Sequence, residues 1–355
     1  MTDSPHLSSL ERQLSPAPIA EGRRRSRKSH GRFFIALAVG LMLWLMSWVV
    51  LIMGQLGRAH PDNLWVKEAY ALKLAAAERL IGQGKVLLVG GSATMFGADS
   101  LQVAEGLGRP AVNLGVNAGL GSYEVPRLVD YVLEPGDVAI MPLEYRLLLW
   151  DGVPSYVTLS WALEHPEALT RWRLKTVLRG LTSLPLDRVL QGYRKFDRTS
   201  LPQGPYGAHN LNARGDQMNT AASLRTDLQQ QALQDLPPEH YDTLYDQSSL
   251  GLDEWEYWWQ RWQLRGVCVV VVPPPFLFVS GYATPSYKKF FDGVPARVME
   301  RGVRYIGHPS DGFFPVEAMF DSNYHLTEES RADYTEWLIA ALHSDDLNCL
   351  PEVPR

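Results

Sequence analysis

An uninterrupted apolar run near the N-terminus limits what this chain can fold into more than any other feature. Residues 33–53 carry no charged side chain and are almost entirely apolar. A helix rises about 1.5 Å per residue, so a helix over this run matches the hydrocarbon core of a bilayer, which is about 30 Å thick. We therefore predict one transmembrane helix over residues 32–54. A cleaved signal peptide has an apolar region of only about 7–15 residues, and bulky side chains fill the end of this run.

The charges that flank the apolar run predict its orientation. A cluster of six basic residues at positions 23–32 precedes it, and only Arg58 and Lys67 follow it closely. Basic residues stay on the cytoplasmic side of a membrane, and the same cluster argues against a helix buried in a soluble domain. We expect a single-pass protein of the cytoplasmic (inner) membrane, with its N-terminus in the cytoplasm and its main domain in the periplasm or outside the cell. Residues 1–31, rich in Ser, Pro and Arg, are expected to form a disordered cytoplasmic tail.

The outer part of the chain alternates between short apolar runs and helical stretches. The runs predict five strands, over residues 85–89, 111–114, 138–143, 267–272 and 303–306. Helices are expected over residues 100–107, 124–133, 255–265, 294–301 and 327–342. This order predicts an α/β fold with a doubly wound, flavodoxin-like parallel sheet, whose ligand site lies at the carboxyl ends of the strands.

The pattern also divides the chain into segments. Residues 55–83 are expected to form a helical linker, residues 84–342 the α/β domain, and residues 343–355 a C-terminal tail. Residues 151–250 are helical in pattern and broken by prolines. We interpret them as an insertion that forms a cap over the site or a partner surface. A polar, turn-rich stretch within it, residues 208–216, either lines the site or is an ordinary loop, and we favour the loop.

Composition narrows the function classes. The net charge of -5 gives no reason to expect a nucleic-acid partner. No spacing of Cys and His resembles a zinc site, and we expect neither a metal nor a cofactor. The two cysteines, Cys268 and Cys349, leave a disulfide open, although we favour two free thiols.

Three short motifs carry the chemistry. Ser92 follows Gly90-Gly91 between the first strand and a helix, where the helix N-terminus favours a developing negative charge. The same turn would also suit a simple N-cap or a phosphate cradle. Gly115 follows the second strand, where a glycine lets the backbone approach a substrate. Asp321 and His325 precede the final helix, and such a pair suits the base of a nucleophilic serine.

Together, these motifs resemble those of the SGNH (GDSL-like) hydrolase superfamily, over residues 84–145 and 255–342. The resemblance implies that Ser92 is the nucleophile, that His325 is its base and that Asp321 orients the histidine. The N–H groups of Ser92 and Gly115 would contribute to the oxyanion hole.

Two positions depart from the family pattern. Its Gly-x-Asn block after the third strand is absent, and residues 142–146 read Pro-Leu-Glu-Tyr-Arg instead. We expect Asn117 to supply the missing donor. The family's Asp lies three residues before the His, whereas Asp321 lies four before His325, so Asp311 is a second candidate for the orienting carboxylate.

With these departures, the chain resembles the divergent membrane-anchored SGNH-like proteins that accompany membrane-bound O-acyltransferases. Examples are the alginate O-acetylation proteins and the D-alanylation D protein of teichoic acids. The resemblance implies an extracytoplasmic acyltransferase or esterase that O-acetylates a secreted or cell-envelope polysaccharide. Its partner would be an integral-membrane O-acyltransferase or a polysaccharide synthesis complex. Two alternatives stay open: a membrane-tethered esterase or lipase, and a non-catalytic scaffold of an export or modification complex. Five aromatic residues are candidates to stack on sugar rings: Trp150, Trp161, Trp172, Tyr193 and Tyr206.

Overall fold

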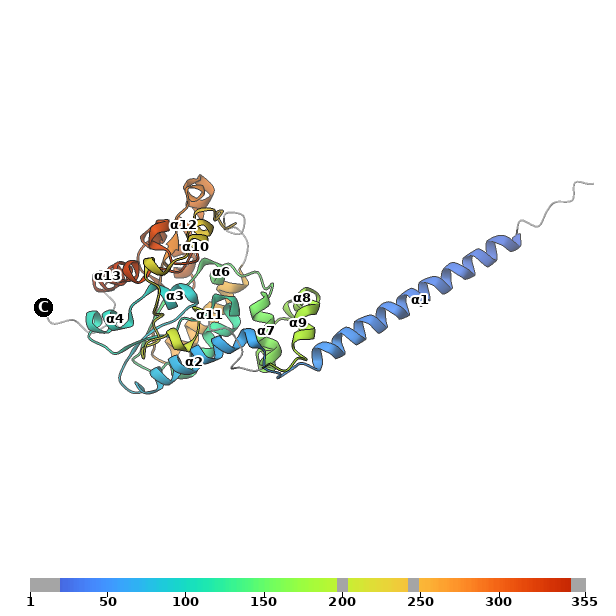
Figure 1. Cartoon of the computed structure of the whole chain (residues 1–355), viewed down its shortest axis with the longest axis horizontal. Coiled ribbons are helices and arrows are strands. Elements are labelled where there is room, and N and C mark those ends of the chain that lie inside the picture. The colour runs from blue at the N-terminus through green and yellow to red at the C-terminus, as the bar shows by residue number, and fades with distance from the viewer. Residues whose placement is uncertain (1–19, 197–203, 242–248, 346–355) are drawn as a thin grey trace, which may run out of the picture. The chain divides into compact units, whose positions relative to one another are not determined.

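The computed structural model describes residues 20–196, 204–241 and 249–345, and the chain splits into two compact units after Gly54 (Figure 1). The first unit contains one helix, α1 (Ala20–Met53). Its part from His30 to Met53 is a candidate membrane span with a mean hydropathy of 2.5. The helix begins at Ala20, so residues 20–31 are helical where we expected a disordered tail. Arg and Lys are good helix formers, and they extend the helix that the apolar run forms. Residues 1–19 lie outside the described residues.

The second unit is built on a five-stranded sheet in which every neighbouring pair is parallel, as predicted. The strand order is β2-β1-β3-β4-β6. The strands are β1 (Val86–Leu88), β2 (Ala111–Asn113), β3 (Val138–Pro142), β4 (Cys268–Val272) and β6 (Arg304–Tyr305). Because β2 and β3 pair with opposite edges of β1, the direction of winding reverses at β1 and β3. Ligands of open α/β sheets bind at such a reversal. A second, two-stranded sheet of β5 (Phe276–Leu277) and β7 (Phe313–Phe314) was not predicted.

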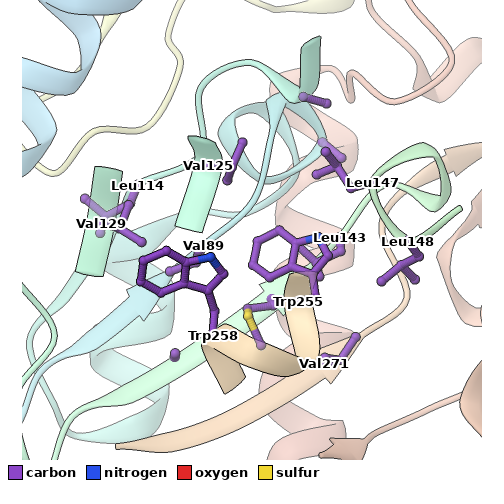
Figure 2. Packing of buried hydrophobic residues seen from close by; sticks show 14 of the residues in the cluster. Val89, Leu114, Val125, Val129, Leu143, Leu147, Leu148, Trp255, Trp258 and Val271 are labelled. Carbon is purple, nitrogen blue, oxygen red and sulfur yellow. The ribbon is translucent and has the colours of Figure 1, made fainter. Parts of the chain in front are cut away.

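Helices cover both faces of the sheet because successive strand side chains point to opposite sides. Leu87 and Val89 join one apolar cluster, and Val86 and Leu88 join the other. The first cluster is completed by α2 (Pro61–Glu78), α5 (Gly121–Val129), α11 (Leu250–Leu264) and α12 (Pro285–Met299), and the second by α4 (Ser100–Leu107) and α13 (Glu328–Ser344). Figure 2 shows two indole rings of α11, Trp255 and Trp258, among apolar side chains of the first cluster.

We had expected residues 55–83 to form a helical linker, but helix α2 is part of the domain. Val66, Ala69 and Tyr70 belong to the first apolar cluster, and each is almost fully buried. Their spacing places them on one face of the helix. The apolar face of α2 therefore covers the sheet.

The expected insertion contains short helices rather than a separate domain. They are α7 (Tyr156–Glu164), α8 (Leu174–Ser183), α9 (Leu186–Gln191) and α10 (Asp227–Gln234), with three-residue and six-residue 3₁₀ turns between them. Another short helix, α6 (Tyr145–Leu148), ends just before the insertion. Trp161 is buried in the first apolar cluster, so α7 shares the core of the α/β domain. Residues 197–203 and 242–248 of this region lie outside the described residues.

The part of the insertion from residue 204 to residue 220 closes the β2 edge of the sheet. The N–H of Asn113 in β2 donates to the carbonyl of Arg214 at 2.9 Å. The Nζ of Lys73, from α2, is fully buried and donates to the carbonyls of Asn113 (3.1 Å) and Gly215. A covered edge cannot pair with another chain, so this segment completes the fold.

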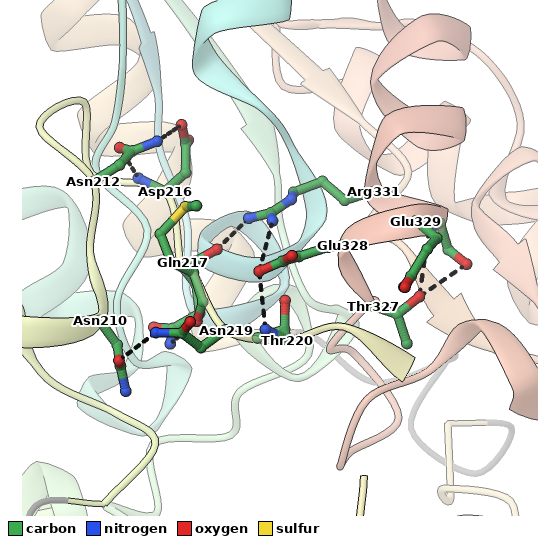
Figure 3. Close-up of polar contacts among 12 residues, drawn as sticks. Asn210, Asn212, Asp216, Gln217, Asn219, Thr220, Thr327, Glu328, Glu329 and Arg331 are labelled. Carbon is green, nitrogen blue, oxygen red and sulfur yellow. Dashed lines mark hydrogen bonds and ion pairs between the residues drawn. The ribbon is translucent and has the colours of Figure 1, made fainter. Parts of the chain in front are cut away.

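The same segment is attached at its other end to the start of α13. The N–H of Thr220 donates to the Glu328 carboxylate at 3.0 Å, and the Arg331 guanidinium donates to the carbonyl of Gln217. Figure 3 shows these contacts beside the Asn212–Asp216 pair. Residues 208–216 are therefore an ordered part of the domain, connected to both β2 and α13.

Cys268, the first residue of β4, is disulfide-bonded. The free thiol that we favoured from the sequence is therefore wrong for this residue. An apolar run predicts a buried strand but says nothing of what approaches its first residue. Cys349, the other cysteine of the sequence, lies outside the described residues.

Lys73 makes stability depend on pH in a predictable direction. Burial lowers its pKa from 10.5 to about 7, against the opposing effect of Asp216. Between these values the unfolded chain holds a proton that the folded chain has lost, so the contribution of Lys73 to the free energy of unfolding rises with pH. We expect the difference between the wild type and Lys73→Met to increase from pH 7 towards pH 10.5 in denaturant titrations of the full chain in detergent. A difference that is constant across this range would contradict the assignment.

Candidate active site

Ser92 is the first residue of α3 (Ser92–Gly97), directly after the Gly90-Gly91 turn that follows β1. Both glycines are required by close contacts. A Cβ on Gly90 would lie 2.1 Å from Oγ1 of Thr94, and a Cβ on Gly91 would lie 2.4 Å from Oε1 of Glu144. The glycine-rich turn therefore brings the backbone before Ser92 against the end of β3, at the reversal point of the sheet.

The Glu144 carboxylate binds the turn on both sides of Ser92. Its two oxygens accept hydrogen bonds from the N–H groups of Gly91 (3.1 Å) and Ala93 (2.8 Å). Glu144 is buried, and burial raises its pKa, while the two N–H groups act in the opposite direction. As the first helical residue of α3, Ser92 has no intrahelical acceptor for its own N–H. In the part of the chain that the structure describes, the N–H of Ser92 therefore lies without an acceptor between two N–H groups that are bonded.

His325 forms a chain of hydrogen bonds with Asp321 and Tyr206. Its Nδ1 lies 2.7 Å from Oδ1 of Asp321, and the Tyr206 hydroxyl donates to Oδ2 of the same carboxylate at 2.6 Å. Burial favours the neutral acid, but the hydrogen bonds from His325 and Tyr206 outweigh it and lower the pKa of Asp321. An ionised Asp321 requires Nδ1 of His325 to carry the proton, which leaves Nε2 as a base.

The backbone explains why a spacing of four residues orients this histidine. The N–H of Phe320 donates to the carbonyl of His325 at 2.6 Å, and an antiparallel bridge joins Met319 to Leu326. These contacts close a tight loop over residues 320–325, in which Asp321 and His325 face each other. The second candidate, Asp311, lies elsewhere: its carboxylate accepts from the N–H of His308 at 2.7 Å.

The ring of His325 stacks on Phe96 of α3. The two ring centroids are 4.0 Å apart and the planes differ by 7°. Phe96 lies four residues after Ser92, and side chains at this spacing share one face of a helix and lean towards its N-terminus. His325 is therefore placed along the face of α3 that carries Ser92. Within the described residues no hydrogen bond joins the two side chains, and apo sites often tighten only when a substrate binds.

The remaining predicted donors, Gly115 and Asn117, have different surroundings. The N–H of Gly115 donates to Oδ1 of Asn113 at 3.0 Å, so this proton already has an acceptor. Oδ1 of Asn117 accepts from the N–H of Gly119 at 2.7 Å, and the described residues provide no acceptor for its Nδ2. The next residue, Ala118, lies against the turn before Ser92, since a Cβ on Gly91 would be 2.6 Å from its nitrogen. Asn117 thus precedes a residue that packs against the turn before Ser92, and its Nδ2 has no acceptor among the described residues.

A cavity of about 380 Å³ lies between the segment after β3 and residues 239–241, and neither Ser92 nor His325 lines it. Two of its lining residues, Arg146 and Glu239, form an ion pair at 2.9 Å. The Arg146 guanidinium also lies 5.3 Å from the ring centroid of Tyr324, and Glu239 accepts from the side chain of Asn323. The cavity wall is thereby connected to the loop that carries His325.

The five aromatic residues that we considered for stacking on sugar rings have different surroundings. Trp161 and Trp172 are buried and cannot receive a ligand, whereas Trp150 lines the cavity and Tyr206 supports Asp321. Tyr193 is 40% exposed and lies under the guanidinium of Arg58. No group of three or more His, Cys, Asp or Glu side chains in the described ranges is arranged to hold a metal ion.

Sequence reasoning missed two residues of the site, Phe96 and Glu144. It named Tyr206 but missed that this residue binds Asp321. A signal existed for Glu144, because a carboxylate directly after a buried strand must find a donor at the carboxyl end of the sheet. Tyr206 gave no such signal, since it pairs with a residue more than a hundred positions away.

Searches for similar proteins gave no match to any family model, to any curated protein or to any solved structure.

The role of Glu144 in holding the turn can be tested by substitution. Glu144→Ala leaves two buried N–H groups without an acceptor, and each such loss costs about 1–3 kcal/mol. We expect the free energy of unfolding to fall by roughly 2–5 kcal/mol, and by less for Glu144→Gln, which keeps one carbonyl oxygen. The control is Glu329→Ala, whose carboxylate accepts a backbone N–H at an exposed position, with an expected loss below about 1 kcal/mol. Equal losses for the two alanine variants would show that Glu144 does not hold the turn.

Proposed function

We propose that this chain is a membrane-anchored, extracytoplasmic SGNH-like acyltransferase that O-acetylates a secreted or cell-envelope polysaccharide through an ester on Ser92. The observation that carries the proposal is the Asp321–His325 pair, held by Tyr206 and stacked on the helix that begins at Ser92. The strand order β2-β1-β3-β4-β6 supports the flavodoxin-like doubly wound fold that the resemblance implies.

The residues of the site suit a two-step acyl transfer. In the first step Nε2 of His325 takes the proton of the Ser92 hydroxyl while Oγ attacks the acyl carbonyl carbon. The bond to the leaving group then breaks, the histidinium returns the proton to that group, and an acyl ester on Ser92 is formed. In the second step a sugar hydroxyl gives its proton to Nε2 of His325 and its oxygen attacks the ester carbonyl carbon. The bond to Oγ of Ser92 then breaks, and the histidinium returns the proton to Oγ, which restores the free serine. Asp321 keeps the ring oriented and stabilises its charged form.

The oxyanion of each step needs donors that are already in position. The N–H of Ser92, aligned between the two that Glu144 binds, is the first. The Nδ2 of Asn117 is the second, in place of the family asparagine. The cavity beside the loop of His325 would receive the acceptor saccharide, with Trp150 in its wall.

Topology supports an extracytoplasmic site and a membrane partner. The basic cluster before the apolar run and the few basic residues after it favour a cytoplasmic N-terminus. A disulfide at Cys268 suits an oxidising compartment. The single anchor would hold the domain beside an integral-membrane O-acyltransferase or a polysaccharide synthesis complex able to deliver the acyl group.

The nucleophile can be identified by covalent labelling. We expect a fluorophosphonate probe to label the full-length chain, and Ser92→Ala or His325→Ala to reduce the labelling rate by at least about 10³-fold, as for other serine nucleophiles and their bases. Ser183→Ala, on the exposed end of α8, should label like the wild type. Labelling that persists in Ser92→Ala would place the nucleophile elsewhere.

Transfer and hydrolysis are separated by the acceptor. With an activated acetyl ester as donor, we expect an added oligosaccharide to increase the turnover of the wild type and to carry the acetyl group in mass spectra. If acetate is the only product at every oligosaccharide concentration, the chain is a membrane-tethered esterase and not a transferase.

Two features of the oxyanion hole favour the alternative of a non-catalytic scaffold. Glu144 stands at the family's asparagine position, and the N–H of Gly115 is already bonded to Asn113, so two donors of the usual oxyanion hole are altered. Measuring polymer acetylation in cells distinguishes the enzyme from the scaffold. A scaffold predicts normal acetylation with Ser92→Ala, whereas the enzyme predicts its loss at an unchanged amount of protein.

A further inference from the structure

Helix α8 presents its apolar face to solvent and a polar or small face to the domain. Leu174 and Leu178, one turn apart, are 72% and 53% exposed. The buried residues of this helix are Thr176 and Gly180, which lie about 200° around the axis from these leucines. A surface helix of a soluble domain normally turns its apolar face inwards, so the orientation of α8 is inverted.

Helix α9 also exposes two leucines. Leu186 and Leu190 are 57% and 48% exposed, whereas Arg188 and Val189 are almost fully buried. The Arg188 guanidinium donates to Oγ of Ser160 in α7 (2.8 Å) and to Oε1 of Gln55 (3.2 Å). The arginine thus fixes α9 to the domain and leaves its leucines facing outwards.

Helix α9 contacts the first residue of the second unit, Gln55. Gln55 is two residues beyond Met53, where the candidate span ends. Two residues cover at most about 7 Å. Gly192, at the end of α9, also lies against Gln55, since a Cβ there would be 2.1 Å from Oε1. The helix that carries these exposed leucines is therefore attached to the residue that follows the candidate span.

The charge of this region suits anionic lipid. Residues 171–195 contain seven basic residues and one acidic residue, Asp187, in a chain whose net charge is -5. Of the seven, Arg188 is buried, and Arg171, Arg173 and Arg179 form ion pairs at 3.5–3.8 Å with carboxylates outside this stretch. Lys175 and Arg179 lie beside the leucine stripe of α8. Helices that lie in a membrane interface combine an apolar face with Lys and Arg in this way.

We propose that α8 and α9 lie in the surface of the membrane that α1 spans, with their leucines at the boundary of the acyl chains and the neighbouring basic side chains among lipid phosphates. This inference rests on the single-span topology of the proposed function, not on its chemistry. The domain then has two attachments to the bilayer, the anchor and this surface, and its orientation on the membrane is fixed.

Spin labels on the full-length chain test the proposal. We choose Leu178→Cys and Leu190→Cys as test positions and Leu264→Cys, 89% exposed at the end of α11, as the matched control. Labelling without reductant leaves the Cys268 disulfide intact, and the unsubstituted chain gives the background. One chain is placed in each nanodisc of phosphatidylcholine and phosphatidylglycerol. Power saturation then compares collisions with oxygen, which concentrates in lipid, and with a water-soluble nickel chelate.

We expect labels at positions 178 and 190 to gain oxygen collisions and lose nickel collisions relative to position 264. Collision rates equal to those at position 264 would show that the labels are exposed to water, which would overturn the proposal. Low collision rates with both reagents would show that protein covers the helices, which also overturns it. Repeating the series with Ser92→Ala should leave all values unchanged, so a failure of the chemistry does not affect this readout. Lys175→Glu with Arg179→Glu should reduce the oxygen gain in these discs, but not in discs of phosphatidylcholine alone.

Discussion

The Glu144 carboxylate joins the two strand ends between which the candidate site forms. It follows β3, accepts N–H groups on both sides of Ser92 after β1, and thereby connects neighbouring strands at the reversal point of the sheet. An asparagine has an amide N–H₂ that can donate to a substrate, whereas both carboxyl oxygens of Glu144 accept hydrogen bonds from the turn. Under the proposed function, this position therefore aligns the N–H of Ser92 instead of donating to an oxyanion.

The second half of the site depends on a segment that is far from it in sequence. Tyr206 donates to Asp321, and the residues after it cover β2 and reach the first turn of α13, shortly after His325. The buried Lys73 binds the same segment, because its Nζ donates to the carbonyl of Gly215 as well as to that of Asn113. Because one ordered segment contacts β2, α13 and Asp321, the position of the Asp321–His325 pair depends on the insertion as well as on the sheet.

The sequence predicted the strands and most helices because buried parallel strands are short apolar runs and amphipathic helices have a clear period. It also predicted the Asp321–His325 pair, since both residues lie in one short loop. It did not predict the packing of α2, because an apolar face does not name its partner. For the same reason the sequence could not assign Tyr206 to Asp321, because this contact joins positions widely separated in the chain and only the fold brings them together.

The state of Gly115 bears on how the site would handle an oxyanion. Asn113 is held by hydrogen bonds from its Nδ2 to the carbonyls of Thr94 (2.8 Å) and Ala98 (3.3 Å), so its Oδ1 stays fixed on the N–H of Gly115. The proposed hole then has two donors, from Ser92 and Asn117. One missing donor costs about 10²–10³ in rate in other acyl-transfer enzymes. Such a site would react slowly with an acyl donor met at random in solution. A second attachment to the membrane would offset this, because a domain of fixed orientation meets an acyl group delivered at the bilayer in one productive arrangement.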